Sequence, residues 1–139
     1  MATERTLALI KPDAVGRGLA GEILARILEA GFSIAACKTL RLTKSEAEGF
    51  YAVHKGRPFF NDLTAFMSSG KIFALVLEAD GAITKWRDVM GATDPAKAAP
   101  GTIRRDLGTS IQNNCTHGSD APETASFEIG YFFSASELI

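Results

Sequence analysis

The chain has 139 residues, of which 46% are hydrophobic and 22% are charged, and its net charge is −1 at pH 7. This length predicts a single domain, residues 1–139, and the composition is ordinary for a globular protein. The weak net charge argues against a surface for nucleic acid or anionic membrane, and no apolar run approaches the ~20 residues of a membrane span.

The first predicted element is a strand at Thr6–Ile10, which is apolar on both faces and therefore central in its sheet. Ala20–Ala30 follows with helical spacing of its apolar residues. Phe32–Leu42 carries its apolar residues on one parity, which is typical of a half-exposed edge strand. Thr43–Glu46 forms a capping box and predicts the start of another helix.

Pro58 predicts the first turn of a further helix, whose apolar face includes Phe59. Six apolar residues in a row, Ile72–Leu77, predict a second central strand. Asp80 is the expected N-cap of the next helix. The apolar stripe of that helix consists of Ile83, Trp86 and Met90.

Residues 92–109 are rich in Pro, Gly, Ala and Thr and are predicted to form a long loop, which compact domains rarely keep without a functional use. A last short strand near Ile111–His117 leads into the final helix. Two central strands, two edge strands and this order of elements predict an α+β fold. We expect a ferredoxin-like four-stranded antiparallel sheet with packed helices.

The final helix carries a carboxylate on its apolar stripe, which consists of Ala125, Glu128, Ile129 and Phe132. An unpaired buried carboxylate is costly, and His117 is its nearest candidate partner in the sequence. A purely structural His–Glu pair is the alternative to a catalytic one, and structural pairs are the more common kind.

Several familiar sites are excluded by spacing. Gly16–Gly21 matches G-x-G-x-x-G, but five residues including Pro12 separate it from the preceding strand, and no acidic residue ends the next strand. Protein-kinase motifs, a P-loop and metal-site spacing are also missing. The two cysteines, Cys37 and Cys115, form no disulfide framework, and no cleavable apolar segment begins the chain. We therefore expect a cytoplasmic protein.

Cations, amides and one hydroxyl along the chain could bind a phosphate, although each alone is more simply a solvated surface group. They are Lys11, His54, Lys55, Arg57, Arg87, Thr93, Arg104, Arg105, Asn113 and Asn114. Imidazole is largely neutral at pH 7 and can attack phosphorus without a separate base. A histidine beside such cations fits phosphoryl transfer, which depends on positioning and charge stabilisation.

Four segments resemble the signature blocks of nucleoside diphosphate kinases, in the family's order and almost from end to end. They are IKPDAV at Ile10–Val15, FYAVHKGRPFF at Phe50–Phe60, WRDVMGATDPAKAAPGTIRRDLG at Trp86–Gly108 and NNCTHGSDAPETASFEIGYFF at Asn113–Phe133. The resemblance implies the ferredoxin-like fold and reversible ping-pong transfer of a terminal phosphoryl group. The donor would be a nucleoside triphosphate, chiefly ATP, and the acceptor a nucleoside or deoxynucleoside diphosphate.

The resemblance also implies Mg2+ carried on the nucleotide phosphates without a protein cage, and no requirement for nucleic acid or membrane. It implies a homo-oligomer built from dimers, either a tetramer or a hexamer.

By this resemblance His117 is the phosphorylated nucleophile and Glu128 helps to hold its ring, with Tyr51 and Ser119 beside it. The nucleotide would be bound by Lys11 and Asn114 at the ribose, by Arg87, Thr93 and Arg104 with His54 nearby at the phosphates, and by Phe59 and Ile111 at the base. Lys11 would also lie near the transferred group.

One departure from the family pattern is clear. The family usually has HGSDS followed by a second serine, whereas this chain has Ala121 and Thr124 at those places. Ala121 removes a hydroxyl beside the helix N-terminus but none of the roles above, so we expect activity to survive.

Two alternatives remain open from the sequence. A catalytically idle nucleotide-binding or regulatory module would predict loss of His117, Lys11 or an arginine, and all are present. An RNA-binding sheet of the same topology would predict aromatic residues on the central strands and a positive charge, and Thr6–Ile10 has no aromatic residue.

Overall fold

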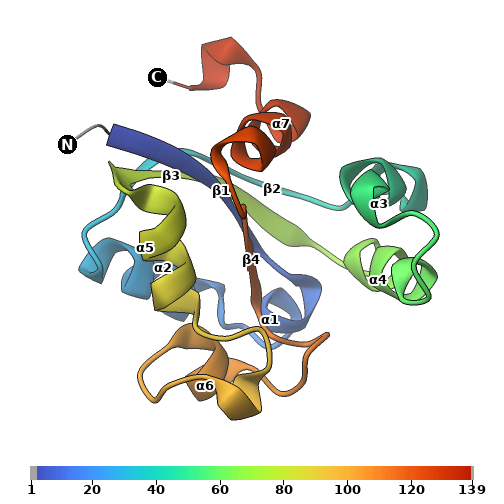
Figure 1. Cartoon of the computed structure of the whole chain (residues 1–139), viewed down its shortest axis with the longest axis horizontal. Coiled ribbons are helices and arrows are strands. Elements are labelled where there is room, and N and C mark those ends of the chain that lie inside the picture. Colours follow the sequence, from blue (N-terminus) through green and yellow to red (C-terminus); the bar gives the residue numbers. More distant parts are fainter. Residues whose placement is uncertain (1–2, 139) are drawn as a thin grey trace.

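A four-stranded antiparallel sheet organises the molecule (Figure 1). The computed structural model describes residues 3–138. The strands are β1 (Thr3–Ile10), β2 (Ser33–Leu40), β3 (Ile72–Asp80) and β4 (Thr116–Gly118). Their order is β2-β3-β1-β4, so β1 and β3 are central and β2 and β4 lie at the edges. The predicted antiparallel sheet, with two central and two edge strands, is confirmed.

Helices connect and cover the strands. They are α1 (Pro12–Gly16), α2 (Ala20–Glu29), α3 (Lys44–Phe50), α4 (Phe60–Met67), α5 (Ala82–Met90), α6 (Ile103–Leu107) and α7 (Pro122–Phe132), with short 3-10 turns η1 (Ala52–His54), η2 (Pro95–Lys97) and η3 (Ala135–Glu137). Within residues 3–138 no helix combines the length and apolar character needed to cross a membrane. The predicted capping box at α3 is present, because Thr43 and Glu46 exchange side-chain to backbone hydrogen bonds.

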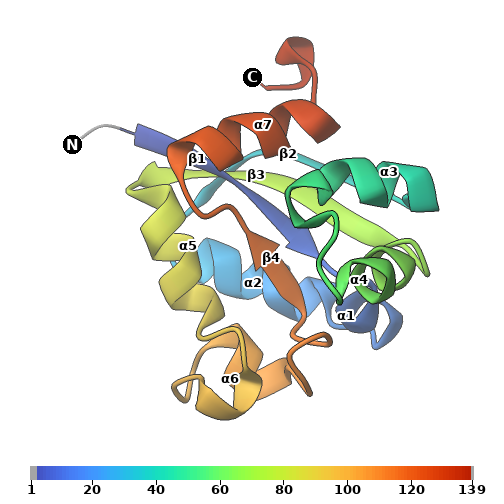
Figure 2. The ribbon, with the colours of Figure 1, turned by 45° about the vertical axis from the view of Figure 1, so that its right-hand side comes forward.

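An apolar core lies on each face of the sheet. Leu7 and Leu9 of β1 pack in one core with residues of α3, α4 and α7. Ala8 and Ile10 face the opposite way and pack in the other core with residues of α2 and α5, among them Trp86 of α5. Figure 2 shows α7 and α3 on one side of the sheet and α2 on the other. Because both faces are covered, the described chain offers no open sheet face of the kind that RNA-recognition domains use.

The start of α5 differs from the sequence prediction. Asp80 is the last residue of β3, and the N-cap is Gly81, with a left-handed φ of 60°. The Ile83 N–H donates at 2.9 Å to the carboxylate of Glu4 on β1. A side chain from another strand therefore supplies the cap.

The predicted apolar face of α4 is also wrong in part. The helix begins at Phe60, so Pro58 precedes it, and Phe59 is its N-cap with 47% of its surface exposed. Of the other residues predicted on this face, Met67 is buried, and Leu63 and Phe66 are partly buried against the core. Phe60 and Thr64 are buried positions that the prediction omitted.

The segment predicted as a long loop contains ordered structure. Asp94 caps η2 by accepting from Ala96 N, and Thr102 caps α6 by accepting from Arg105 N. The last strand is shorter than predicted, so Ile111 lies in the irregular stretch before it.

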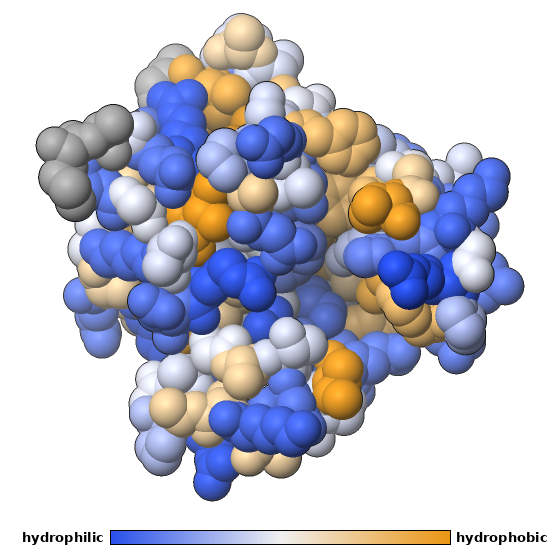
Figure 3. All heavy atoms as spheres, in the orientation of Figure 1, coloured by the Kyte–Doolittle hydropathy of each residue, from blue (hydrophilic) through white to orange (hydrophobic). Residues whose placement is uncertain are grey.

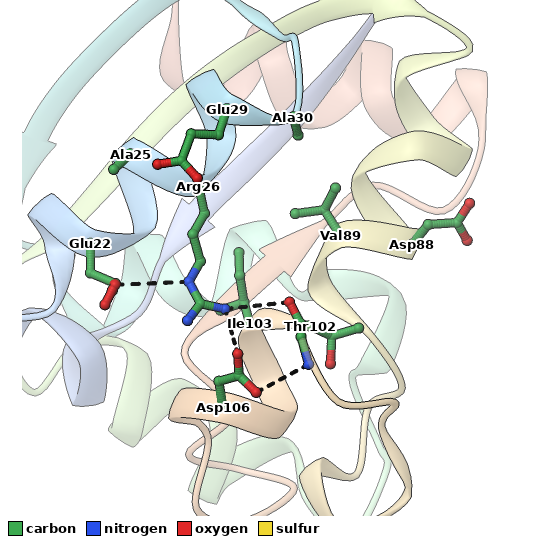
Figure 4. A pocket seen from close by; sticks show the side chains of 11 residues that line it. Glu22, Ala25, Arg26, Glu29, Ala30, Asp88, Val89, Thr102, Ile103 and Asp106 are labelled. Atoms are coloured by element: carbon green, nitrogen blue, oxygen red, sulfur yellow. Dashed lines mark hydrogen bonds and ion pairs between the residues drawn. The ribbon is translucent and has the colours of Figure 1, made fainter.

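The ordered 92–109 segment is fastened to α2 across a cleft of about 580 Å³ between α2, α5 and α6 (Figure 4). Arg26 donates to Asp106 Oδ2 at 2.9 Å and to Gly101 O at 3.4 Å. Hydrogen bonds from Arg26 and from the Gly101 N–H hold the pKa of Asp106 below its ordinary value. Arg26 therefore ties the segment to the body of the molecule.

Candidate active site

The backbone of His117 is fixed from two sides. On β4 it pairs with Leu9 of β1. On its other side the Trp86 Nε1–H donates to His117 O at 3.1 Å. A Cβ at Gly118 would lie 2.5 Å from the Trp86 ring, so glycine is what allows β4 to pack against the indole.

The imidazole of His117 is held through one nitrogen. Its Nε2 lies 2.9 Å from Glu128 Oε1, and the Ser119 hydroxyl donates to the same oxygen at 2.8 Å. The side chains of His117 and Glu128 are only 21% and 14% exposed. Since a carboxylate only accepts hydrogen bonds, this contact assigns the proton to Nε2 and leaves the Nδ1 lone pair available.

Aromatic rings surround the imidazole. Phe50 meets His117 edge-on at a centroid distance of 5.4 Å, and Tyr51 does so at 6.1 Å. Burial, with a smaller contribution from Glu128, raises the pKa of Tyr51 well above its ordinary value, so the phenol stays neutral. His54 stacks on the outer side of Tyr51, at 6.2 Å. Phe50 begins one of the signature segments but was assigned no role in the site, so its contact with His117 was missed.

Lys11 is a buried cation beside this histidine. Its Nζ donates to Asn114 Oδ1 at 2.8 Å and to Gln112 O at 2.9 Å. Burial lowers the pKa of Lys11 to about 8, with Asp13 opposing the change and Arg104 adding to it. The ammonium is therefore predominantly charged at neutral pH.

Arg104 is the second buried cation, with 8% of its surface exposed. It donates to Gly91 O at 3.1 Å and to Thr116 O at 2.9 Å, so backbone carbonyls hold it without neutralising its charge. Burial, reinforced by Arg87, lowers the pKa of Arg104 to about 10, which still leaves it charged at neutral pH.

A cleft of about 530 Å³ brings these groups together. Figure 3 shows the surface hollowed between the α3–α4 region and the rest of the molecule. The lining residues are Lys11, Tyr51, Phe59, Leu63, Thr93, Arg104, Ile111, Gln112, Asn114, Thr116 and His117. Phe59 and Ile111 are exposed apolar side chains, and Asn114 Nδ2 donates to Thr93 O at 3.0 Å.

Three other candidates from the sequence are not among the lining residues of the cleft. Arg87 on α5 pairs with Asp120 at 2.7 Å in an exposed salt bridge. His54 contacts the Phe59 ring at a centroid distance of 5.4 Å. Arg105 donates to Ala96 O at 3.0 Å, so it braces its own segment and is not a cleft cation.

The departure at the start of α7 has a local compensation. Ala121 is the N-cap and has no hydroxyl, but Thr124 Oγ1 accepts from Ala121 N at 2.9 Å and from Asp120 N at 3.2 Å. A threonine inside the helix thus binds the backbone donors just before it.

Within residues 3–138 no group of three or more His, Cys, Asp or Glu side chains is arranged to hold a metal ion. The polar side chains of the cleft are chiefly ammonium, guanidinium, amide and hydroxyl groups, which suit the oxygens of an anion.

Comparison with known proteins agrees with this arrangement. The family model "Nucleoside diphosphate kinase" matches residues 4–138. The nucleoside diphosphate kinase of Syntrophotalea carbinolica is 62% identical over 98% of this chain and 99% of its own length. That of Geotalea daltonii is 61% identical with the same coverage.

Solved structures give the same result. A crystal form of the Aquifex aeolicus nucleoside diphosphate kinase superposes with a TM-score of 0.97 at 46% identity, covering 99% of this chain and 100% of that one. The Halobacterium salinarum enzyme in complex with CDP has a TM-score of 0.95 at 41% identity, covering 99% and 92%. The predicted ferredoxin-like fold is confirmed, and the chain belongs to the nucleoside diphosphate kinase family.

Proposed function

We propose that this chain reversibly transfers the terminal phosphoryl group from a nucleoside triphosphate to a nucleoside diphosphate through a phosphohistidine at Nδ1 of His117. One observation carries the proposal. Glu128 binds Nε2 of a histidine that lines a cleft containing two buried cations, Lys11 and Arg104. The family membership and the names of the relatives support the same activity.

In the first half-reaction the Nδ1 lone pair attacks the terminal phosphorus, and the P–O bond to the leaving diphosphate breaks. The ring gains positive charge as the P–N bond forms, and the Glu128 carboxylate at Nε2 stabilises that charge. A second nucleoside diphosphate then takes the phosphoryl group by the reverse step. Each half-reaction transfers one phosphoryl group. After both half-reactions the protein is chemically unchanged.

The phosphates carry most of the binding in this proposal. Arg104 and Lys11 supply charge that no carboxylate of the described residues bridges. Arg87 joins them by exchanging its exposed contact with Asp120 for a phosphate oxygen, an exchange that costs little because exposed pairs are weak. Asn114 and Lys11 would also bind the ribose hydroxyls.

The base would lie between Phe59 and Ile111, neither of which can donate or accept a hydrogen bond. Every base has a π-face on which an aromatic ring can stack, so such a site accepts purines and pyrimidines alike. The Halobacterium relative, whose structure contains the pyrimidine nucleotide CDP, is consistent with this.

Magnesium belongs to the substrate in this scheme. Mg2+ prefers oxygen ligands and retains several waters, so it is commonly bound through substrate phosphates. The cleft supplies cations that fit the remaining phosphate oxygens, and Mg2+ would neutralise the rest of the charge.

We further propose a homo-oligomer built from dimers, as the family resemblance implies. Exposed large apolar side chains, among them Leu28 at 58% and Phe127 at 55%, favour burial against other copies. Light scattering of the purified chain distinguishes a tetramer from a hexamer, and a monomeric mass would contradict the proposal.

The test of the reaction is to incubate the protein with labelled ATP and magnesium. An acid-labile, alkali-stable phosphoenzyme should form, and 31P NMR should assign the phosphorus to Nδ1. His117→Ala should abolish the label. His54→Ala removes the other histidine of the chain and must still be labelled. A label that persists without His117, or that survives acid, would show that the nucleophile is wrongly assigned.

A further inference from the structure

A strained turn lies two residues before His117. Cys115 has a φ of 73° and is the one non-glycine residue with positive φ in the described part of the chain. The Thr116 N–H donates to Asn114 O at 2.9 Å. A hydrogen bond between residues i and i+2 around a φ near +75° defines the rare classic γ-turn. Such strain persists only where surrounding groups over-determine it.

Two groups from the junction of β1 and α1 hold this turn. The Lys11 N–H donates to Cys115 O at 2.8 Å, and the Cys115 N–H donates to Asp13 Oδ2 at 3.1 Å. The peptide groups on both sides of the Cys115 Cα are therefore fixed. Asp13 lies in the first turn of α1 but does not cap it, because the N-cap of that helix has no side-chain bond.

The turn separates groups that must keep their relative positions. On one side Asn114 accepts a hydrogen bond from Lys11 Nζ, and on the other Thr116 accepts one from Arg104. His117 follows directly. We propose that Asp13 is a positioning residue for phosphoryl transfer: its carboxylate holds the turn at Cys115 and thereby fixes His117 relative to Lys11. This inference rests on the function proposed above.

Electrostatics gives the same carboxylate a second effect. Among the described residues, the titratable groups near Lys11 are Asp13, Arg104, the Cys115 thiol, Tyr51 and His117. Burial and the neighbouring Asp13 raise the pKa of Cys115 to about 11, so the thiol is neutral at physiological pH. Asp13 opposes the burial that lowers the pKa of Lys11 to about 8. Without the Asp13 charge the pKa of Lys11 falls further, and Lys11 loses its proton at a lower pH.

Two substitutions separate these effects. Asp13→Asn retains an acceptor for Cys115 N but loses the charge. It should leave kcat near the wild-type value at pH about 6 and move the alkaline limb of kcat/KM to lower pH. Asp13→Ala loses the acceptor and should reduce kcat by roughly 10- to 100-fold throughout the pH range, because the strained turn relaxes and the reacting groups separate.

A second substitution at Cys115 provides the decisive control. Glycine adopts positive φ without strain, so Cys115→Gly in the Asp13→Ala background should restore most of the lost kcat. Cys115→Ala in that background removes the same thiol but keeps a Cβ, and should restore nothing. Melting temperatures of all the variants show whether they fold.

The outcomes distinguish this inference from the proposed function. If wild-type protein is labelled at His117 but Asp13→Ala keeps full kcat, or if glycine and alanine at position 115 rescue equally, the positioning role is overturned while the proposed function stands. If Asp13→Ala does not fold, the two double variants are compared with wild type, and a kcat in Asp13→Ala with Cys115→Gly no higher than in Asp13→Ala with Cys115→Ala overturns it. Loss of the label from wild-type protein would instead overturn the proposed function itself.

Discussion

The cleft beside His117 and the cleft between α2, α5 and α6 are similar in volume, about 530 and 580 Å³, and each contains an arginine. In the second cleft Arg26 is bound to Asp106. In the first, the hydrogen bonds of Arg104 within residues 3–138 go to backbone carbonyls, and no carboxylate is among the described lining residues. The second cleft is lined by the carboxylates Glu22, Glu29, Asp88 and Asp106. Cleft size therefore does not distinguish the two, whereas cationic charge without a carboxylate partner among the described residues favours the first cleft as the proposed phosphate site.

Replacing Arg104 and Arg26 by alanine, one at a time, tests this comparison. The largest expected effect on activity is that of Arg104→Ala. Arg104→Ala should lower kcat/KM by roughly 10- to 150-fold, because hydrogen bonds to charged groups contribute about 1.5–3 kcal/mol. Arg26→Ala should change kcat/KM by less than about 3-fold and lower the melting temperature by a few degrees at most, since exposed ion pairs stabilise little. Steady-state kinetics and thermal unfolding of both variants measure this. Equal losses of activity would show that the two clefts are not functionally distinct.

Glu128→Gln tests whether the orientation of His117 contributes to the transfer rate separately from the cationic charge of its cleft. Transfer should slow by roughly 10- to 100-fold, by analogy with the loss of groups that orient metal ligands. Nucleotide affinity should remain almost intact, because Glu128 is not a lining residue of the cleft. Single-turnover rates and equilibrium binding of a nucleoside diphosphate separate the two quantities. Unchanged turnover would remove Glu128 from the mechanism.

Phe59→Ala has the smallest expected effect and tests whether the apolar wall of the first cleft selects a base. With Phe59 47% exposed, its stacking should be worth about 1 kcal/mol, so affinity should fall by roughly 5-fold for all bases together. Wild-type catalytic efficiencies for adenine, guanine, cytosine, uracil and thymine nucleotides should spread over roughly 100-fold or less. A ten-thousand-fold preference for one base would reveal a polar group that reads it.

Local patterns predicted what depends on neighbours in the sequence. Uninterrupted apolar runs at Thr6–Ile10 and Ile72–Leu77 identified the central strands, because both faces of such strands are buried. Helical spacing placed Glu128 on the inner face of α7, and the need to pair its charge indicated His117.

Those local patterns could not predict contacts between residues far apart in the sequence. Glu4 caps a helix 79 residues away, and Asp13 binds the backbone of a residue 102 positions later. Adjacent arginines could not be distinguished either, because α6 was predicted as loop. The orientation of that helix is what places Arg104 in the cleft and leaves Arg105 bound to its own segment.

The pairing of β4 with β1 determines when the catalytic centre can form during synthesis of the chain. Ser119 and Leu7, which bond beside the histidine, are 112 residues apart. Contacts of such separation form late because the intervening chain must be ordered first. Until the C-terminal segment arrives, β1 has an unpaired edge that can pair with another nascent chain. A ribosome-bound chain therefore carries most of its sheet while it still lacks a complete catalytic centre.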